Sequence, residues 1–390
     1  MRSVDPWAGS RGVFLLPLDE SDRNYLERAL ELAESGRGLT APNPIVGAIV
    51  VSEGRVIGEG YHTGAGRDHA EIAAIKDVSA RSASARTAGA TMYVTLEPCC
   101  VYGRTPPCVP ALLSAGFARV VVGAIDPSQP VNGKGVQQLR EGGIKVDLAE
   151  GDVANRCKRQ NDGFRKVVVT GLPFVTYKYA MTLDGRVASD TGDSRWISGV
   201  ESRLAVHRMR SWMDAVMVGA GTLRLDDPTL TAREVECRRQ PLRVVVDTDL
   251  CLDREAALVR TAGEGPVLIV CGEQVRADRR AEVESWGVEV MAVSAGRTEP
   301  SAVARLLAAR GVQNLLLEGG PTLAGAWWSA GLIDRVIAYI SPRLLSGEVL
   351  RAPLQGVGSE TVAAAVQVRE TEVLTIGADV CVSGYVREAL

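Results

Sequence analysis

The amino-acid sequence predicts an α/β protein built from two domains. Its 390 residues exceed the ~100–200 residues of an ordinary domain. Short apolar runs of strand length alternate with amphipathic helical patterns along both halves, which is typical of mostly parallel sheets covered by helices. Hydrophobic residues make up 46% and charged residues 23%, an ordinary globular composition. We expect a flexible extension over residues 1–20, a first domain over 21–166 and a second domain over 167–390.

The elements of the first domain follow from hydrophobic periodicity and from turn residues. The first is an amphipathic helix over 22–36, with Asp22 as its N-cap. A hairpin turn is expected at Glu53-Gly54, because a strand pattern precedes and follows it. The strands are expected over 45–51, 56–61, 92–96, 120–124 and 144–148, and the remaining helices over 69–77, 107–115 and 153–163.

The second domain repeats a strand–helix alternation without any internal sequence repeat. Proline at position 321 suits the first turn of a helix. The strands are expected over 174–180, 215–218, 242–247, 267–271, 288–293, 314–317 and 335–340, with helices that include 201–212, 301–309 and 321–330.

Charge and cysteine content narrow the class of protein. The formal net charge is −3 and the isoelectric point is about 5.8, which disfavours a sequence-independent nucleic-acid binder. Eight cysteines in a chain of this length do not make a disulfide scaffold, so a reducing cytoplasm is expected. No apolar run reaches membrane length. We therefore expect small-molecule substrates, with neither a nucleic acid nor a membrane as partner.

One histidine, one glutamate and two cysteines carry the clearest chemistry. His69, Cys99 and Cys108 can hold Zn²⁺ with its fourth position open, and Glu71 can then move protons, as in nucleobase deaminases. Zn²⁺ would lower the pKa of a bound water to ~7. Both expected helix starts can face one pocket. The alternatives are unrelated buried thiols or a structural zinc site, for which Cys100 is the obvious fourth candidate.

The second half lacks a G-x-G-x-x-G or P-loop motif but contains two glycine-bearing strand-to-helix turns. The residues from Glu318 onwards combine a strand end, two glycines and a proline at the helix start. Such an uncluttered helix N-terminus can approach a diphosphate with its backbone N–H groups. Gly219–Thr222 forms a second turn of this kind. Each turn alone is better explained as plain structure, but two turns with Arg210 and Arg233 nearby favour a nucleotide plus a phosphorylated substrate.

Several motifs together resemble the family of bifunctional riboflavin-biosynthesis deaminase-reductases. They are H-A-E at 69–71, T-L-E-P-C at 95–99 and G-R-T-P-P-C at 103–108, with P-N-P at 42–44. From about Pro173 onwards the second half is similar to the reductase of the same family. The resemblance implies a cytidine-deaminase-like α/β/α domain followed by a dihydrofolate-reductase-like domain with a mostly parallel sheet. It also implies Zn²⁺ in the first domain and NADPH in the second.

In the deaminase half, the resemblance implies that Asn43, His62 and Arg104 contact the substrate. One departure is present, because the family usually has histidine where this chain has Val101, followed here by Tyr102. This difference leaves open a diverged paralogue that acts on another phosphoribosylated pyrimidine.

In the reductase half, the resemblance implies a larger set of contacts. The implied substrate residues are Ser194, Arg210, Leu230, Arg233 and Glu318. The implied NADPH residues are Ala180, Trp196, Thr222, Asp226, Thr248, Gly320, Pro321, Thr322, Leu323, Ala324, Gly325 and Ala326.

Proton transfer in the reductase requires titratable side chains near the sugar. Lys178, Asp226 and Glu318 are the candidates, and the alternative is that these charges only orient ligands or pair with one another. Asp184 is expected to be structural in an Asp-Gly turn. His207 is expected on a solvated helix face, and Trp327-Trp328 is expected to pack the helix or an oligomer contact.

The sequence thus predicts a two-domain enzyme of riboflavin synthesis. The first domain would deaminate 2,5-diamino-6-ribosylamino-4(3H)-pyrimidinone 5′-phosphate. The second would reduce the resulting 5-amino-6-ribosylaminouracil 5′-phosphate with NADPH. A homodimer or tetramer through the reductase sheet is plausible. Two further alternatives stay open, a nucleic-acid deaminase and a zinc-stabilised nucleotide sensor without catalysis.

Overall fold

A computed structural model describes residues 18–82, 86–293, 298–348 and 351–388 of the chain. Most of the extension expected over 1–20 therefore lies outside the described residues, while Leu18 is buried and Asp19 caps the first helix. The chain forms two compact units, with the division between Gln160 and Asn161. The segment Arg37–Pro44 is an exception, because it belongs to the second unit.

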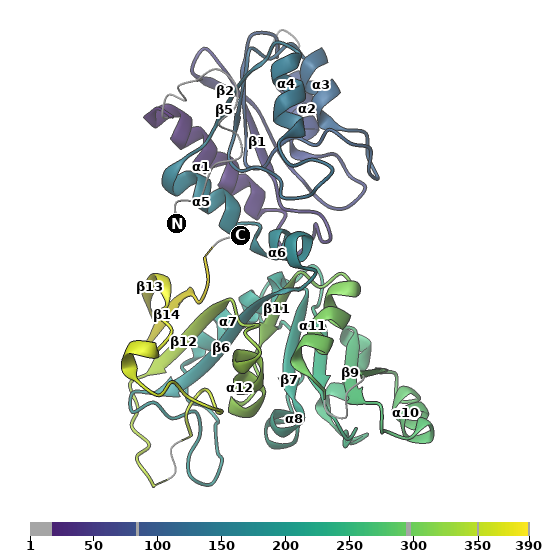
Figure 1. Ribbon diagram of the computed structural model, residues 1–390, viewed down its shortest axis with the longest axis vertical. Coiled ribbons are helices and arrows are strands. Elements are labelled where there is room, and N and C mark those ends of the chain that lie inside the picture. The colour runs from purple at the N-terminus through teal and green to yellow at the C-terminus, as the bar shows by residue number, and fades with distance from the viewer. Residues whose placement is uncertain (1–17, 83–85, 294–297, 349–350, 389–390) are drawn as a thin grey trace. The chain divides into compact units, whose positions relative to one another are not determined.

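A five-stranded sheet forms the centre of the first unit. Its strands are β1 (Gly47–Ser52), β2 (Arg55–Tyr61), β3 (Thr91–Val94), β4 (Arg119–Val122) and β5 (Lys145–Leu148). They lie in the order β2-β1-β3-β4-β5 (Figure 1). β1 pairs antiparallel with β2 and β3, whereas β3, β4 and β5 run parallel. The hairpin turn falls at Glu53-Gly54 as predicted, and both residues have a positive φ, 50° and 72°.

Helices cover both faces of this sheet. They are α1 (Glu20–Glu34), α2 (Ala70–Arg81), α3 (Cys108–Ser114), α4 (Lys134–Glu141) and α5 (Gly151–Arg159). α2, α3 and α4 pack on one face and α1 and α5 on the other (Figure 1). Side chains of β4 alternate accordingly, since Val120 and Val122 join the core under α2–α4 and Val121 does not. The parallel strands and their covering helices bring the starts of α2 and α3 to one edge of the sheet.

The N-cap predicted for α1 is wrong. Asp19 caps the helix by accepting a hydrogen bond of 2.7 Å from the backbone N–H of Asp22. Asp22 instead lies inside the helix and is buried. Its carboxylate accepts hydrogen bonds from Tyr93 Oη and from both Nη atoms of Arg119, each at 2.7 Å. An aspartate near a helix start is typical of an N-cap. The ion pair of Asp22 with Arg119 of β4 could not be predicted, because the local sequence does not show this contact.

The helix predicted over 153–163 is also wrong as a single element. α5 ends at Arg159, and a second helix, α6 (Asp162–Thr170), begins after Asn161. Asn161 has φ −116° and ψ 26°, so the helical backbone is interrupted at this residue. The interruption coincides with the division between the two units.

A nine-stranded sheet forms the centre of the second unit. Its strands are β6 (Phe174–Thr182), β7 (Ala215–Gly219), β8 (Leu242–Val246), β9 (Val267–Gly272), β10 (Glu289–Val293), β11 (Asn314–Leu317), β12 (Arg335–Ser341), β13 (Arg369–Ile376) and β14 (Asp379–Tyr385). Their order is β10-β9-β8-β7-β11-β6-β12-β14-β13. All pairings from β10 to β12 are parallel, and β14 pairs antiparallel with β12 and β13. The mostly parallel sheet predicted for this half is therefore confirmed.

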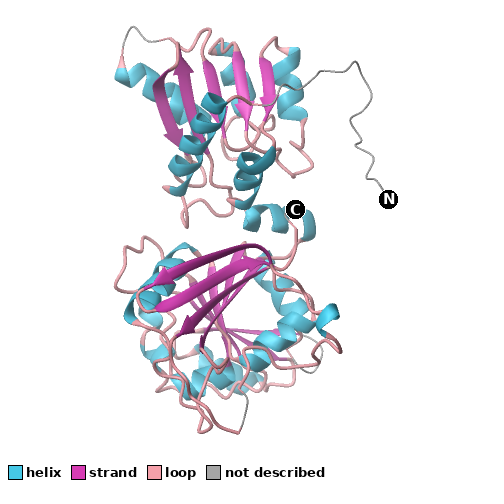
Figure 2. Ribbon diagram, turned by 90° about the vertical axis from the view of Figure 1, so that its left-hand side faces the viewer, coloured by secondary structure: helices cyan, strands magenta, loops and turns pink. Residues whose placement is uncertain are grey.

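Helices again lie on both faces of the sheet (Figure 2). Besides α6 they are α7 (Val200–Trp212), α8 (Ala220–Asp226), α9 (Ala257–Arg260), α10 (Ala277–Glu284), α11 (Pro300–Ala309) and α12 (Pro321–Ser329), with 3₁₀ turns η1 (Ala262–Glu264) and η2 (Val362–Ala364). α11 and α12 pack against one core, in which Trp327 is fully buried. α8, α9 and α10 pack against the core on the other face.

The hairpin β13–β14 and helix α4 were not predicted. All side chains of β13 except the last are exposed, so no buried period marks this edge strand in the sequence. None of the helices in the described part of the chain is both long and apolar enough to cross a membrane.

Candidate metal centre and reductase site

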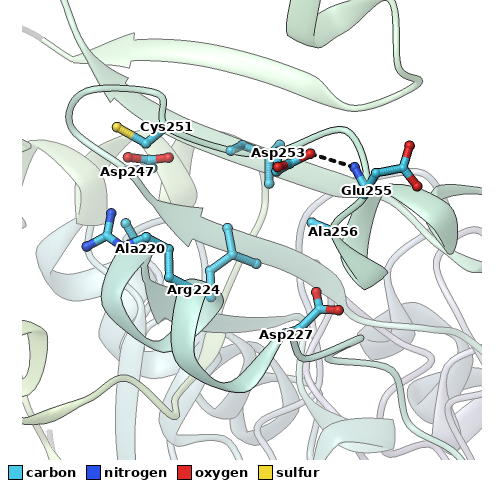
Figure 3. Close-up of a pocket in the computed structure, with 10 residues that line it drawn as sticks. Ala220, Arg224, Asp227, Asp247, Cys251, Asp253, Glu255 and Ala256 are labelled. Carbon is cyan, nitrogen blue, oxygen red and sulfur yellow. Dashed lines mark hydrogen bonds between the residues drawn. The ribbon is translucent and has the colours of Figure 1, made fainter.

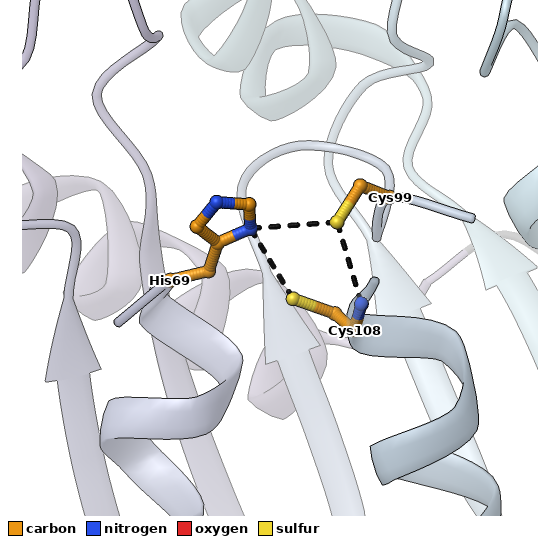
Figure 4. A group of neighbouring side chains, drawn as sticks. All are labelled: His69, Cys99 and Cys108. Atoms are coloured by element: carbon orange, nitrogen blue, oxygen red, sulfur yellow. Dashed lines mark hydrogen bonds between the residues drawn. The ribbon is translucent and has the colours of Figure 1, made fainter. Parts of the chain in front are cut away.

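Three predicted ligands converge in the first unit. His69 is the N-cap residue of α2, Cys108 is the first residue of α3, and Cys99 lies in the loop after β3. Figure 4 shows the three side chains pointing toward one another. The ligand atoms lie within 4.8 Å of each other, and His69 Nδ1 is 3.4 Å from Cys99 Sγ and 3.3 Å from Cys108 Sγ. One nitrogen and two sulfur donors at these distances fit a tetrahedral Zn²⁺ with its fourth position left open.

The Cys99 loop is held in place by backbone and carboxylate contacts. The backbone N–H of Cys108 donates to Cys99 O at 3.0 Å and contacts Cys99 Sγ at 3.3 Å. Glu97 is buried, and its carboxylate accepts from the N–H groups of Gly133, Val136 and Asp126 at 2.8, 3.1 and 3.3 Å. Glu97 thus ties the cysteine loop to the N-terminus of α4. This role of Glu97 was not predicted, although the residue is part of the T-L-E-P-C motif.

Thr105 is a second missed residue, and it contacts the metal ligand from outside. Its Oγ1 lies 3.0 Å from Nε2 of His69, while Nδ1 of the same ring faces the two sulfurs. Such a partner on the far nitrogen fixes the tautomer and the orientation of a metal-binding histidine. The G-R-T-P-P motif was the available signal, because it places a hydroxyl between the two cysteines.

Cys100 does not complete the metal site. Its Sγ lies 3.8 Å from the carbonyl of Pro130, and it is absent from the cluster of ligand atoms found among the described residues. A structural zinc site normally has four protein ligands. The arrangement of donors therefore favours the catalytic type of site over the structural one.

The electrostatics of the centre suit proton transfer. Glu71 is buried, and burial together with the negative charge of Cys99 raises its pKa to about 7. The pKa of Cys99 is lowered to about 4, because the thiol of Cys108 and the ring of His69 hydrogen-bond to its sulfur. The pKa of Cys108 is raised by the same Cys99 and by burial. Without a metal, Cys99 and Cys108 share one negative charge. A bound divalent cation would convert both thiols into thiolates.

The implied substrate residues of the deaminase are found in different surroundings. His62 is buried, its ring centroid lies 5.2 Å from that of His69, and its Nδ1 is 2.9 Å from the carbonyl of Asp68. Arg104 is exposed, as are Val101 and Tyr102. Asn43 lies in the segment Arg37–Pro44, which belongs to the second unit.

A cluster of charged side chains forms at the sheet of the second unit. Leu317 of β11 is the register partner of Tyr177 in β6, so Glu318 and Lys178 follow at the same level of two neighbouring parallel strands. Arg210 of α7 donates to both carboxylate oxygens of Glu318, from Nε at 2.7 Å and from Nη2 at 2.9 Å. The two strands and α7 therefore bring together three residues that are far apart in the sequence, Lys178, Glu318 and Arg210.

The charges of this cluster are largely paired. Burial raises and Arg210 lowers the pKa of Glu318, and the net direction is downward, so Glu318 is an anion. Burial lowers the pKa of Lys178, whose Nζ lies 5.6 Å from the ring centroid of Tyr339. The alternative that these charges pair with one another holds for Glu318 and Arg210. It does not hold for Lys178, which makes no salt bridge within 4.0 Å among the described residues.

The two glycine-bearing turns lie side by side, because β7 and β11 are neighbours in the sheet. Thr222 Oγ1 accepts a hydrogen bond of 3.1 Å from the backbone N–H of Gly320. The start of α12 has no side-chain cap, and a Cβ at Gly221 would meet nothing within 4 Å. An open helix N-terminus beside free space fits the diphosphate of a dinucleotide. Asp226, at the end of α8, accepts from Ser194 Oγ at 3.0 Å.

The opposite face of α8 borders a cavity that the sequence did not predict. The cavity measures about 300 Å³, and α8 contributes Ala220, Leu223 and Arg224 to its wall. These residues are three or four positions apart, so they share one helix face, and Thr222 and Asp226 do not line the cavity. Figure 3 shows Asp247 and Cys251 across from α8.

The other implied reductase residues have varied environments. Trp196 is 55% exposed, with the Arg203 guanidinium 4.7 Å from its ring centroid. Leu230 is fully buried. Thr248 Oγ1 lies 2.8 Å from Thr298 Oγ1, and Thr322 donates to Gln355 at 2.8 Å. Ala180, Pro321 and Leu323 are half-buried, Ala324 and Gly325 are buried, and Ala326 is exposed.

One structural interpretation from the sequence is wrong and two are confirmed. His207 does not lie on a solvated face, because α7 turns it into the protein, where it is buried against the loop after α8. Asp184 is structural, since its carboxylate accepts from Thr182 Oγ1 and from the N–H groups of Leu345 and Ser346. Trp327 packs in the core, and Trp328 is half-buried against it.

Fold and site together define a zinc-dependent deaminase joined to a nucleotide-dependent reductase. Residues 19–124 match the cytidine and deoxycytidylate deaminase zinc-binding region, and residues 173–382 match the RibD C-terminal domain. The chain is 37% identical to the riboflavin biosynthesis protein RibD of Aquifex aeolicus over 93% of this chain and 98% of that protein. It is also 37% identical to RibD of Escherichia coli over 92% and 98%.

Solved structures agree with these relatives. RibD of Acinetobacter baumannii has a TM-score of 0.81 and 34% identity, over 94% of this chain and 99% of that one. A diaminohydroxyphosphoribosylaminopyrimidine deaminase/5-amino-6-(5-phosphoribosylamino)uracil reductase of Thermotoga maritima has a TM-score of 0.79 and 32% identity, over 94% and 98%. The chain belongs to the RibD family of bifunctional riboflavin-biosynthesis enzymes. Its deaminase half uses zinc and its reductase half uses NADPH.

Proposed function

We propose that the first unit deaminates 2,5-diamino-6-ribosylamino-4(3H)-pyrimidinone 5′-phosphate. The second unit then reduces 5-amino-6-ribosylaminouracil 5′-phosphate to the ribityl compound. The name of the Thermotoga maritima relative supports these substrates. The observation that carries the proposal is the convergence of His69, Cys99 and Cys108 beside the buried Glu71. We assign deamination to residues 21–166 and reduction to residues 167–390.

In the deaminase, His69, Cys99 and Cys108 hold the metal, and Thr105 orients the histidine ring. A Zn²⁺ held there would lower the pKa of its water and so supply hydroxide near neutral pH. Glu71 would carry one proton of the attacking water to the ring nitrogen and the second, from the hydroxyl that has been added to the ring, to the leaving amino group, which departs as ammonia. A pKa of about 7 is suited to both transfers. Of the residues that the family resemblance implies for the pyrimidine substrate, His62 and Arg104 belong to this unit and bind it in this proposal.

In the reductase, bound NADPH would supply the hydride that reduces C1′ of the opened ribosylamine. Lys178 serves as the acid at the sugar ring oxygen, because burial lowers its pKa and eases proton donation. Glu318 remains ionised and stabilises the developing positive charge of the imine. Asp226 holds Ser194 against the substrate. The start of α12, with Thr222, Thr248, Ala180 and Trp196, binds the cofactor.

The two arginines of the reductase play different parts in this proposal. Arg210 already uses three of its five N–H donors on Glu318 and on the carbonyl of Thr231. The side chain of Arg233 is 48% exposed, donates one hydrogen bond of 3.3 Å to Thr229 Oγ1, and has its Nε 3.9 Å from the carboxylate of the exposed Glu234. Arg233 therefore makes the main contact with the substrate phosphate, and Arg210 acts mostly by fixing Glu318.

We also propose a cytoplasmic homo-oligomer, a dimer or tetramer that forms through the reductase sheet. The eight free cysteines support a reducing compartment. β13 is an exposed edge strand whose Val373 and Leu374 are 64% and 57% exposed, which is unusual without a covering partner. Sedimentation equilibrium tests this, since Leu374→Lys should shift the mass toward the monomer. An unchanged mass contradicts this interface.

A coupled assay tests the enzymatic proposal. Purified protein receives the diaminopyrimidinone ribosyl phosphate and NADPH, and ammonia release and NADPH loss are followed together. We expect both signals, and Glu71→Gln should abolish ammonia release while reduction of added deaminated intermediate persists. Glu53→Gln, on the exposed hairpin turn, is the matched control.

The departure at Val101 gives the rival outcome. If ammonia appears only with a different phosphoribosylated pyrimidine, then the deaminase belongs to a diverged paralogue. If NADPH is oxidised only when the deaminated intermediate is supplied, the deaminase half has lost its activity.

A further inference from the structure

The loop Thr229–Glu234 carries Arg233, yet no strand pairs with it. Residues 227–233 have no regular secondary structure. Leu230 and Glu234 adopt left-handed backbone, with φ of 57° and 62°, which is unfavourable for residues with side chains. Such a backbone persists only where its surroundings determine it, so other contacts must hold this loop.

Side chains from the start of β8 hold two points of the loop. Arg243, which is fully buried, donates from Nη1 to the carbonyl of Thr229 at 3.1 Å. The amide of Gln240 donates to the carbonyl of Ala232 and accepts from its N–H, both at 2.8 Å. These contacts fix the loop on either side of Thr231.

Helix α7 holds the third point. The carbonyl of Thr231 accepts from Arg210 Nη1 at 3.0 Å and lies 3.2 Å from His207 Nδ1. A carbonyl can only accept, so the N–H of the imidazole must be on Nδ1. Arg210 is shared with Glu318, which makes His207 the contact devoted to Thr231.

The imidazole of His207 is neutral at physiological pH. Burial, together with the positive charges of the nearby Arg210 and Arg233, lowers its pKa to about 4. Glu318 and the Thr231 carbonyl act in the opposite direction but do not restore it. His207 therefore acts as a hydrogen-bond donor without adding a third positive charge beside the two arginines.

We propose that His207 is a positioning residue of the reductase, whose Nδ1–H fixes Thr231 and thereby directs Arg233 to the substrate phosphate. The inference rests on the proposed function of the second unit. Only Ala232 separates Thr231 from Arg233 in the chain, and Gln240 holds both the N–H and the carbonyl of Ala232. The position of Thr231 therefore affects that of Arg233 directly. Loss of the His207 donor leaves the carbonyl of Thr231 held only by Arg210, which Glu318 shares, and so lets the guanidinium of Arg233 move.

The test compares three full-length variants. His207→Leu removes the donor, His207→Asn keeps an N–H donor close to the position of Nδ1, and Arg208→Ala is the control on the exposed face of the same helix. For each variant, kcat and KM are measured with 5-amino-6-ribosylaminouracil 5′-phosphate, with its dephosphorylated nucleoside and with NADPH. Deamination by the same sample reports that the chain is folded.

We expect His207→Leu to raise KM for the phosphorylated substrate about tenfold, which corresponds to about 1.4 kcal/mol. Its kcat should stay within about twofold, and KM for NADPH and for the nucleoside should not change. His207→Asn should restore most of the affinity. In an Arg233→Met background, His207→Leu should add no further loss, because both act through one contact.

Other results overturn the inference. An unchanged KM, an equal rise of KM for the nucleoside, or a loss in kcat alone would show that His207 does not act on the phosphate through Arg233. If His207→Leu does not fold, His207→Ser takes its place in the same comparison. If the unaltered enzyme reduces none of these substrates, the proposed function itself is wrong. This result differs from failure of the inference about His207, in which the unaltered enzyme is active.

Discussion

The metal centre of the first unit and the charged cluster of the second unit are built in opposite ways. In the first unit, His69, Cys99 and Cys108 direct their donor atoms at one point, and the pKa values of Cys99 and Cys108 move in opposite directions. In the second unit, Glu318 and Arg210 already satisfy each other with two hydrogen bonds. The comparison teaches that the first site is completed by an ion, whereas the second is pre-organised by its own side chains.

The largest expected effect comes from Glu71, since it is the only proton carrier proposed for deamination. Glu71→Gln keeps the size of the side chain but removes its basicity. We expect kcat for ammonia release to fall about 10³-fold, within the range of general acid–base catalysis. Zinc content by atomic emission and the rate of NADPH oxidation should stay unchanged. A variant that retains deaminase activity would assign proton transfer to another group and break the comparison.

The next effect tests the paired cluster. Glu318→Gln leaves Arg210 beside a neutral amide and removes the carboxylate proposed to stabilise the imine. We expect kcat of the reductase to fall about 10²-fold, or about 2.7 kcal/mol. Steady-state kinetics with the deaminated intermediate measures this change, and ammonia release is the internal control. If only KM rises, then Glu318 merely holds Arg210, and the cluster is structural.

A smaller effect, on zinc affinity, is expected at Thr105. This residue tests whether the ligand His69 has to be oriented by a neighbouring side chain, and so sharpens the comparison between the two sites. Thr105→Val preserves the shape but loses the oxygen next to His69 Nε2. Outer partners of this kind typically contribute 10–100-fold in metal affinity. Competition with a chromogenic zinc chelator should show a loss in this range, and Thr87→Val is the matched control outside the site. Equal affinities in both variants would remove Thr105 from the metal centre.

The smallest effect concerns stability and pH in the first unit. Burial raises the pKa of Asp22, but hydrogen bonds from Arg119 and Tyr93 outweigh it and hold the folded-state pKa below the ordinary value. A lowered pKa contributes stability that is fully present above the unfolded-state pKa of about 3.9 and is lost as pH falls through the folded-state value.

Asp22→Asn should therefore cost about 1–2 kcal/mol at pH 7. The difference from the unaltered protein should begin to shrink below about pH 4, where the carboxyl becomes protonated in the unfolded chain, and should be lost once the pH falls below the lowered folded-state pKa. Urea unfolding followed by circular dichroism at both pH values measures it, with Asp152→Asn as an exposed control. A difference that is constant with pH would mean that the charge of Asp22 does not stabilise the fold.

The sequence predicted those features that local pattern determines. The hairpin between β1 and β2 could be predicted at Glu53-Gly54, because both turn residues need a positive φ there. The metal ligands could be predicted because each sits at a helix start or strand end beside a recognisable motif. The order of the elements and the parallel sheet followed from the strand–helix alternation.

The missed features depend on contacts between distant segments. Asp22 was predicted as a cap because its partner Arg119 is far away in the sequence. His207 was placed on a solvated face because the loop that covers it at Thr231 has no periodic pattern. Glu97 and Thr105 lie within known motifs, but their partners, the N-terminus of α4 and the far nitrogen of His69, become visible only in three dimensions.

The segment Arg37–Pro44 belongs to the second unit although 116 residues of the first unit, Ile45–Gln160, follow it in the chain. Within the second unit, Gln313 donates to the carbonyl of Pro42 at 2.7 Å, and Arg37 lies 6.0 Å from the ring centroid of Trp212. A single cut after Gln160 would thus separate this segment from the rest of the unit that it packs with. The two units are therefore interleaved along the chain, so a stop codon or protease site at this point does not follow the boundary of the second unit.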